Sequence, residues 1–270
     1  MLNIGFIGFG HMAKMLIACL IDQGGIDPHT IFVTRRNSEK LKEIPALFPH
    51  VTAVATPLQL AEQCRLIFLC VKPAQIKEVG CAILPALNSD THIVSIAAGV
   101  SLDYLQKLLT PQVSRLLPSV TLATPQGVAL LAHSDRLPET DAAFLQKLIG
   151  RFATVKLLKE SDMDLAMVLT GCLPGLLAAF YEELTQAACR CTGELTPVDI
   201  REMIRKTVFA TSLLLDHDNT GFSALQAAVA TKGGVTQAGI DVLDRSLPAL
   251  LDTLLCTTLA KAQTVNPDKG

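Results

Sequence analysis

The sequence predicts an α/β region built on a Rossmann-like, doubly wound parallel sheet, followed by an all-helical region. Three observations support this. Short apolar runs alternate with helical segments over the first part of the chain, as in βα units. The runs are apolar at nearly every position, which is typical of strands buried on both faces. After Glu160 we find no strand pattern. We therefore expect two domains, residues 1–158 and 159–270.

The predicted strands are short apolar runs rich in Ile, Val, Leu and Phe. They are Leu2–Ile7, Thr30–Thr34, Leu66–Val71, His92–Ala97, Val113–Leu117 and Gly127–Ala132. Three segments between them have helical spacing, namely Met12–Gln23, Ser38–Leu47 and Ala74–Leu84.

The second region consists of predicted helices. They are Asp162–Gly171, Leu176–Cys191, Pro197–Leu215, Ala224–Thr231 and Thr236–Gln263. Pro197 suits a first helical turn, with Thr196 as its N-cap. Asp216–Gly221 is typical of a turn, and we expect Asn266–Gly270 to be disordered. The stretch Met203–Leu215 is apolar on more than one face, which indicates that a second chain covers it. We expect a homodimer or a higher homo-oligomer formed through this domain.

Composition argues against several function classes. Lys and Arg number 23 against 25 Asp and Glu, so the chain lacks the basic excess of a nucleic-acid binder. The eight cysteines form no C-x-x-C pair and the six histidines are scattered, so we predict reduced thiols and no metal site. The apolar stretch Leu165–Tyr181 is interrupted by Gly and Pro, which favours a buried helix over a membrane span. We expect a cytoplasmic protein without a membrane partner.

A glycine-rich motif follows the first predicted strand. It reads Gly8-Phe9-Gly10-His11-Met12-Ala13, a G-x-G-x-x-A between a strand and a helix. In this context the first glycine permits the tight turn, and the second permits a pyrophosphate to approach the backbone. The helix N-terminus then offers amide donors to the phosphates. We predict dinucleotide binding here, in preference to a tight turn without a ligand.

The end of the second strand indicates which dinucleotide binds. An NAD site usually carries a carboxylate there, but this chain has Thr34, Arg35, Arg36 and Ser38. Guanidinium and hydroxyl groups suit a 2′-phosphate. The alternative is an exposed basic loop. We predict NADPH as the cofactor, with NADH as the second possibility.

Two further strand ends complete the predicted cofactor site. Val71, Lys72 and Pro73 lie at the end of the predicted strand Leu66–Val71, where strand ends face the cofactor in open α/β sheets. For Pro73 alone, an ordinary helix start is an equal alternative. The small residues Ala97, Ala98 and Gly99 follow the next strand and leave room for a nicotinamide ring.

Together these motifs resemble the pyrroline-5-carboxylate reductase family, the last enzymes of proline synthesis. The matching segments run in order along almost the whole chain. They are IGFIGFGHMA, VKP, VSIAAGV, RLLPSVTLATPQG and TKGGVTQAG. The resemblance implies NAD(P)H-dependent reduction of a cyclic imine acid. It also places Ser119, where the family has Asn, among the cofactor residues.

The segment TKGGVT, residues 231–236, interrupts the helical region. Consecutive glycines before a helix expose amide groups that bind anions, although a Gly-capped helix corner explains the same pattern. The resemblance favours a substrate site. It implies that Gly233 and Gly234 receive the substrate carboxylate and that the Thr236 hydroxyl approaches the imine nitrogen. Thr231 matches the family's serine, and Lys232 replaces its proline.

One departure from the family keeps other functions open. Where the family has S-G-S-G-P-A-Y, this chain has Thr170-Gly171-Cys172-Leu173-Pro174-Gly175-Leu176. Leu173 replaces a Gly and Leu176 replaces the Tyr. A reductase of another cyclic imine acid is therefore the second hypothesis. The third is a non-catalytic dinucleotide-binding regulatory protein.

Overall fold

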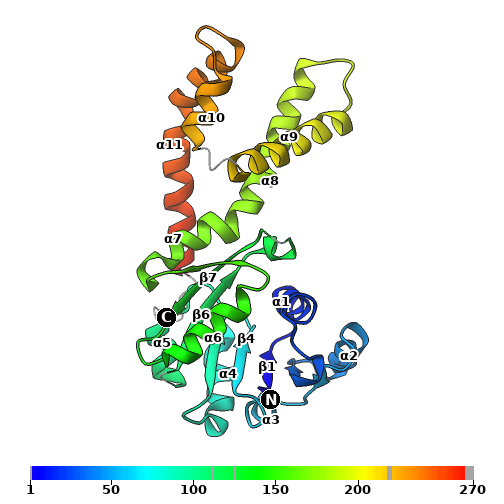
Figure 1. The fold of residues 1–270 in the computed structure, drawn as a ribbon, viewed down its shortest axis with the longest axis vertical. Coiled ribbons are helices and arrows are strands. Elements are labelled where there is room, and N and C mark those ends of the chain that lie inside the picture. The colour runs from blue at the N-terminus through cyan, green and yellow to red at the C-terminus, as the bar shows by residue number, and fades with distance from the viewer. Residues whose placement is uncertain (1, 111, 125, 218–220, 265–270) are drawn as a thin grey trace. The chain divides into compact units, whose positions relative to one another are not determined.

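An eight-stranded sheet forms the N-terminal part of the protein (Figure 1). The computed structural model describes residues 2–110, 112–124, 126–217 and 221–264. The strand order is β3-β2-β1-β4-β5-β6-β7-β8. The strands are β1 (Ile4–Ile7), β2 (Ile31–Thr34), β3 (Thr52–Ala53), β4 (Leu66–Leu69), β5 (His92–Ser95), β6 (Val113–Pro118), β7 (Val128–His133) and β8 (Thr154–Leu157). All six predicted strands are present, and the predicted Rossmann-like fold is confirmed.

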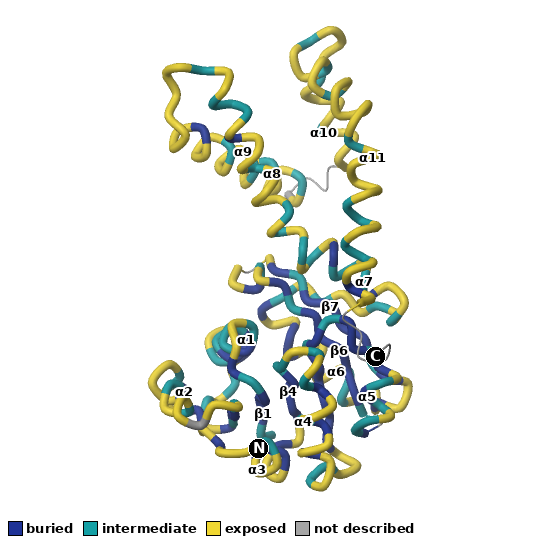
Figure 2. The backbone as a smooth tube through the Cα atoms, turned by 180° about the vertical axis from the view of Figure 1, so that it is seen from behind, coloured by how far each residue is buried: buried dark blue, intermediate teal, exposed yellow. Residues whose placement is uncertain are grey.

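Helices cover both faces of the sheet, as the doubly wound prediction requires. One apolar cluster joins the sheet to α1 (His11–Asp22), α2 (Glu43–Leu47) and α6 (Glu139–Ile149). The other joins it to α3 (Pro57–Ala61), α4 (Ile76–Ile83) and α5 (Leu102–Leu108). Figure 2 shows the strands between them as the most buried part of the chain. Burial on both faces explains why these strands are continuous apolar runs.

The strand register brings the carboxyl ends of four strands, β1, β2, β4 and β5, to one edge of the sheet. Ile7 pairs with Thr34 of β2 and with Leu69 of β4, and Leu69 pairs with Ser95 of β5. Strand order reverses between β2-β1 and β4-β5, which is the point where open α/β sheets bind ligands. The residues that follow these strands therefore meet at a topological switch point.

The sheet differs from the fully parallel prediction at β7, which runs antiparallel to β6. Only residues 119–127 connect the two strands, and a parallel crossover needs a dozen residues or more. Strands β3 and β8 were not predicted. They are mostly exposed and lack the apolar run that identified the others.

The remainder of the chain is helical. Its helices are α7 (Met163–Met167), the π-helix η7 (Val168–Cys172), α8 (Leu173–Cys191), α9 (Pro197–His217), α10 (Phe222–Val229) and α11 (Val235–Thr264). The predicted break between Gly171 and Leu176 is wrong, because η7 continues directly into α8 and Pro174 falls in the first turn of α8. Inside a continuous helix, the missing N–H and the ring of Pro174 disturb the hydrogen-bond ladder, and the π-helical turn η7 lies directly before it.

The Thr196 cap is confirmed. Its hydroxyl accepts a bond from the Asp199 N–H at 3.2 Å, and the Asp199 carboxylate accepts one from the Thr196 N–H at 3.2 Å. Residues 218–220 of the predicted turn, and the C-terminal residues 266–270, lie outside the described part.

The chain divides into two compact units, Met1–Cys172 with Thr258–Gly270, and Leu173–Thr257. In the second unit α9, α10 and most of α11 are exposed (Figure 2). Exposed apolar side chains there include Phe209 at 66%, Phe222 at 83% and Val235 at 94%. One helical run in the described chain, Glu160–Cys191, is long and apolar enough to cross a membrane. A single run of this kind is weak evidence, since an apolar helix face that another chain covers meets the same criteria.

Candidate active site

The turn after β1 has the geometry that the glycine motif predicts. Gly8 has φ +102°, and a Cβ there would lie 2.4 Å from the Cys70 carbonyl oxygen. Gly8 N–H donates to the Thr34 carbonyl at 2.9 Å, which ties the turn to β2. Gly10 differs, because its φ is −83° and no atom lies within 4 Å of a Cβ built there. Gly8 is thus required by the fold, whereas Gly10 faces open space at the start of α1.

His11 is exposed and Met12 half-buried in the first turn of α1, where backbone N–H groups have no partner within the helix. Phe9 is buried to 6% exposure and packs edge-on against Phe48, so only its backbone can meet a ligand. The turn and the helix start together form a cradle that suits a phosphate.

Some residues after β2 are used in contacts within the protein, and others are free to contact a ligand. Arg35 Nη1 bonds Glu43 Oε2 at 2.7 Å, and its guanidinium lies over the Phe9 ring. Arg36 is exposed. Thr34 is buried, and its hydroxyl oxygen has no hydrogen-bond partner among the described residues. Ser38 begins the short helix η2 (Ser38–Lys42), and its side chain is not described. Arg36 is therefore the more available guanidinium of the two.

The end of β4 lies beside the Gly8 turn, and the end of β5 lies next to β4. Val71 and Pro73 are half-buried and Lys72 is exposed. Pro73 begins the short helix η3 (Pro73–Gln75), so its helix-start role is present. Burial raises the pKa of the neighbouring Cys70 thiol far above its usual range, which keeps it a neutral thiol. Thiolate chemistry at this edge is therefore disfavoured.

Small residues line the end of β5. Ala97 is 4% exposed, Ala98 is half-buried, and Gly99 has φ +74°. The Ala97 N–H donates to the Ser95 hydroxyl at 3.3 Å. A left-handed glycine after two alanines produces a tight loop without bulky side chains, which fits the flat ring predicted here.

Ser119 is buried and committed to bonds within the protein. Its hydroxyl donates to the Thr170 carbonyl at 2.8 Å and accepts from the Thr121 N–H and hydroxyl at 3.2 and 2.9 Å. One donor and two acceptor positions are all that a hydroxyl has. A contact with the cofactor would have to displace one of these bonds.

The TKGGVT segment is a tight turn at the start of α11. Gly234 N–H donates to the Thr231 carbonyl at 2.9 Å, and Gly233 between them has φ +73°. A Cβ on Gly234 would lie 2.4 Å from the Thr231 hydroxyl oxygen. Both glycines are therefore needed for the turn itself. Because the Gly234 N–H is used in the turn, the donors left for an anion are Gly233 N–H and the first-turn amides of α11.

The other side chains of this turn are open to solvent. Thr231, Lys232 and Thr236 are all exposed. Lys232 occupies the turn position where proline is favoured. A lysine there makes the turn less rigid than a proline would, but the turn still forms. The Thr236 hydroxyl lies one residue into α11, beside the free amides. The arrangement can bind a carboxylate and present a hydroxyl to a neighbouring polar atom.

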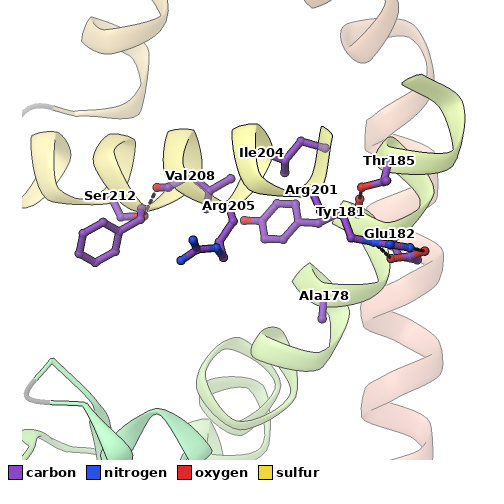
Figure 3. A pocket seen from close by; sticks show the side chains of 10 residues that line it. Ala178, Tyr181, Glu182, Thr185, Arg201, Ile204, Arg205, Val208 and Ser212 are labelled. Atoms are coloured by element: carbon purple, nitrogen blue, oxygen red, sulfur yellow. Dashed lines mark hydrogen bonds and ion pairs between the residues drawn. The ribbon is translucent and has the colours of Figure 1, made fainter. Parts of the chain in front are cut away.

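A separate groove of about 430 Å³ lies between α8 and α9 (Figure 3). Its walls are mainly apolar, with Tyr181 and Phe209 among them. At its rim the Glu182 carboxylate and Arg201 guanidinium form two bonds of 2.8 and 3.2 Å. This pairing lowers the pKa of Glu182 and raises that of Arg201. The groove contains none of the residues 231–236, so it is distinct from the predicted substrate turn.

Sequence reasoning missed a charged network beside the Ala97–Gly99 loop. The Arg115 side chain is 4% exposed and bonds Glu160 Oε1 at 2.9 Å. The same oxygen accepts the Leu102 N–H at 2.7 Å. A charged residue within an otherwise apolar strand, VSRLLP, was the available signal, since a buried Arg needs a partner.

Comparisons with known proteins agree with these features. The family description "NADP oxidoreductase coenzyme F420-dependent" matches residues 3–99, and "Pyrroline-5-carboxylate reductase dimerisation" matches residues 160–265. Pyrroline-5-carboxylate reductase 3 of Bacillus subtilis is 34% identical, over 99% of this chain and 98% of the relative.

Two solved structures have the same fold. A pyrroline-5-carboxylate reductase from Coxiella burnetii superimposes with TM-score 0.86 at 24% identity, and covers 98% of each chain. The Plasmodium falciparum pyrroline carboxylate reductase with NADP bound gives TM-score 0.85 at 19% identity, again over 98% of each chain.

Proposed function

The chain belongs to the pyrroline-5-carboxylate reductase family, and we propose that it reduces 1-pyrroline-5-carboxylate to L-proline with NADPH. The observation that carries this proposal is the 34% identity with the Bacillus subtilis reductase along 99% of the chain. The Rossmann-like sheet and the glycine turn before α11 agree with it. The enzyme is an oxidoreductase that acts on a cyclic C=N bond in proline synthesis.

The residues at the switch point fit NADPH. Gly10 leaves the space that a pyrophosphate needs, and the first turn of α1 supplies N–H donors. Arg36 binds the 2′-phosphate, while Arg35 orders the loop through Glu43. Val71, Lys72, Pro73 and the Ala97–Gly99 loop border the nicotinamide. When bound, NADPH supplies the hydride for the imine carbon.

The turn before α11 binds the substrate. Gly233 N–H and the first-turn amides of α11 receive the carboxylate, and Lys232 adds a positive charge nearby. The Thr236 hydroxyl donates a hydrogen bond to the imine nitrogen. As the carbon gains the hydride, the nitrogen takes the proton of this hydroxyl, and solvent water returns a proton to the exposed Thr236. Holding the imine in one orientation is the main contribution of these groups.

Residues 1–158 thus bind the cofactor, and residues 159–270 bind the substrate and a second copy of the chain. The exposed apolar side chains of α9 and α10 form the contact in a homodimer or a larger homo-oligomer. All eight cysteines are free, which suits a cytoplasmic enzyme. Membranes and nucleic acids are not partners in this proposal.

Growth of a proline-requiring host tests the proposal in cells. A strain that lacks its own pyrroline-5-carboxylate reductase should grow without added proline when it expresses this chain. The Thr236→Ala variant, expressed to the same level, should restore growth poorly. Failure of the wild-type chain to restore growth, when it is soluble and binds NADPH, would point to another imine acid as its substrate.

A further inference from the structure

Glu160 joins α5, which directly follows the predicted nicotinamide loop, to the strand β6. It lies where the chain leaves β8, at the start of the short helix η6 (Glu160–Asp162). Its Oε1 atom accepts the Leu102 N–H at 2.7 Å and the Arg115 Nη1–H at 2.9 Å. One carboxylate oxygen therefore connects the first residue of α5 with the middle of β6.

Arg115 holds this carboxylate in place. The guanidinium extends from a central strand, is 4% exposed, and has Asp164 Oδ1 3.7 Å from its Nη2 atom. Its Nε and Nη2 atoms have no hydrogen-bond partner among the described residues. A buried guanidinium with few partners depends strongly on the carboxylate that it bonds directly, which here is Glu160. The ion pair thus fixes Glu160 relative to the sheet.

The loop that carries Ala97, Ala98 and Gly99 ends at Leu102, the first residue of α5. The side chains of Val100 and Leu102 pack into the core at this end of the loop, since Val100 is fully buried and Leu102 is 6% exposed. Beside Gly99 and Ser101 of the loop lies a pocket of about 180 Å³, which Arg115 and Glu160 also line. The pocket gives the loop room to shift if the bond from Leu102 to Glu160 is lost.

We propose that Glu160, held by Arg115, is a positioning residue for the nicotinamide half of the cofactor. It touches neither cofactor nor substrate. It fixes the backbone at Leu102, and so the position of Ala97–Gly99 beside the ring. The adenosine half, bound at the Gly8–Met12 turn and Arg36, does not depend on it. The inference rests on the proposed NADPH function.

Two ligands separate positioning from general stability. NADPH contains the nicotinamide, and 2′-phospho-ADP-ribose contains the rest of the molecule without the ring. In Glu160→Ala we expect the Kd for NADPH to rise about tenfold, and the Kd for 2′-phospho-ADP-ribose to stay within about twofold. We expect kcat to fall roughly 100-fold, as for misplaced reacting groups.

Three further variants serve as controls. Glu160→Gln keeps an acceptor oxygen for the Leu102 N–H but removes the charge that pairs with Arg115, so it should lose stability and yet bind NADPH more tightly than Glu160→Ala. Asp164→Asn removes a charge near Arg115 without affecting Leu102, and should behave like the wild type. If Glu160→Ala does not fold, Glu160→Asp withdraws the oxygen while keeping the charge, and should weaken NADPH alone.

Equal weakening of both ligands, or unchanged NADPH binding and kcat in the folded Glu160 variants, would overturn the positioning role. A wild-type protein that binds neither ligand contradicts the proposed function itself. The two failures are therefore distinguishable in one experiment.

Discussion

Single residues at the two glycine turns have separate structural and ligand-binding requirements. Gly8 and Gly233 adopt positive φ angles, and Gly234 has the Thr231 side chain too close for a Cβ. Gly10 alone combines ordinary dihedral angles with open space. Substitutions at Gly8 and Gly10 should therefore act through different mechanisms, although both belong to one motif.

Gly10→Ala should fold like the wild type, with an unfolding free energy within about 0.5 kcal/mol of it, and should bind NADPH about tenfold more weakly. Gly8→Ala should lose roughly 2 kcal/mol or more of stability, because its Cβ meets a backbone oxygen at positive φ. Urea unfolding and NADPH titration measure the two effects. Comparable destabilisation by both variants would contradict this assignment.

Thr236→Ala should lower kcat by at least about 100-fold, which is the lower end of the range for loss of a proton donor. NADPH binding should be largely unchanged. Thr236→Ser keeps the hydroxyl and should recover most of the rate. Steady-state kinetics and a separate NADPH titration give both quantities. Unchanged turnover in Thr236→Ala removes this hydroxyl from the mechanism.

Arg36→Ala should weaken NADPH by about 10- to 100-fold, as expected for a lost charged hydrogen bond, and leave NADH binding almost unchanged. The exposed Arg36 is the test residue because Arg35 is already paired with Glu43. Arg36→Lys serves as the control that keeps the charge. An equal loss for both cofactors would assign Arg36 a structural role.

At the scale of elements, a buried polar chain links three strands at the end of the sheet away from the cofactor. Ser114 of β6 lies 2.7 Å from both His92 Nε2 on β5 and His133 Nδ1 on β7. Burial, followed by the charges of His133 and Arg65, lowers the pKa of His92 to about 3. Burial also lowers the pKa of His133. Both rings are therefore neutral in the folded protein at neutral pH.

Because burial keeps the rings of His92 and His133 neutral, we expect the protein to lose stability in acid. The unfolded histidines have pKa values of about 6.5, so they bind protons that the folded ones do not. For His92, the unfolding free energy should fall as pH decreases from about 6.5 towards 3, by up to about 1.4 kcal/mol per pH unit. The lowered pKa of His133 adds to this loss in the same direction. Urea unfolding at several pH values measures the slope.

His92→Gln should fold less stably at neutral pH but show a smaller slope between about pH 6 and 4. His29→Gln, at an exposed position, is the matched control and should keep the wild-type slope. Equal slopes in wild type and His92→Gln would show that this histidine does not couple folding to pH.

The predictable elements were those whose pattern matches their burial. The strands β1, β2, β4, β5, β6 and β7 are apolar runs, and α9 and α11 have long helical patterns with recognisable ends. The strands β3 and β8 are mostly exposed, so no hydrophobic pattern marks them. The antiparallel direction of β7 follows from connection length rather than composition. The π-helix η7 was not predicted, since local propensity does not distinguish it from an interrupted α-helix.

The site was predictable where chemistry determines residue type. The glycine turns were found because glycine is required there. The Glu160 network was missed, because the contact joins residues 58 positions apart and depends on the sheet register. Likewise, the internal bonds of Ser119 depend on Thr170, which only the folded chain brings close.

At the scale of the whole molecule, the exposed apolar helices lie in the region that matches the dimerisation family, and we propose that a second chain covers them. Phe209 and Leu213 of α9 are 66% and 50% exposed. Replacing Phe209 with Glu should lower the molecular mass of the homo-oligomer in sedimentation analysis, because a charge buried in such a contact is unpaired. Lys206→Ala, on an exposed part of the same helix, should leave the mass unchanged. An unchanged mass in Phe209→Glu places the contact elsewhere.

The most direct test of the account is a steady-state assay with 1-pyrroline-5-carboxylate that follows NADPH oxidation and proline formation together. We predict one L-proline for each NADPH consumed, a higher kcat/KM with NADPH than with NADH, and slower turnover of a six-membered cyclic imine acid. Tight NADPH binding without proline formation, together with turnover of another imine acid or of none, would contradict the account.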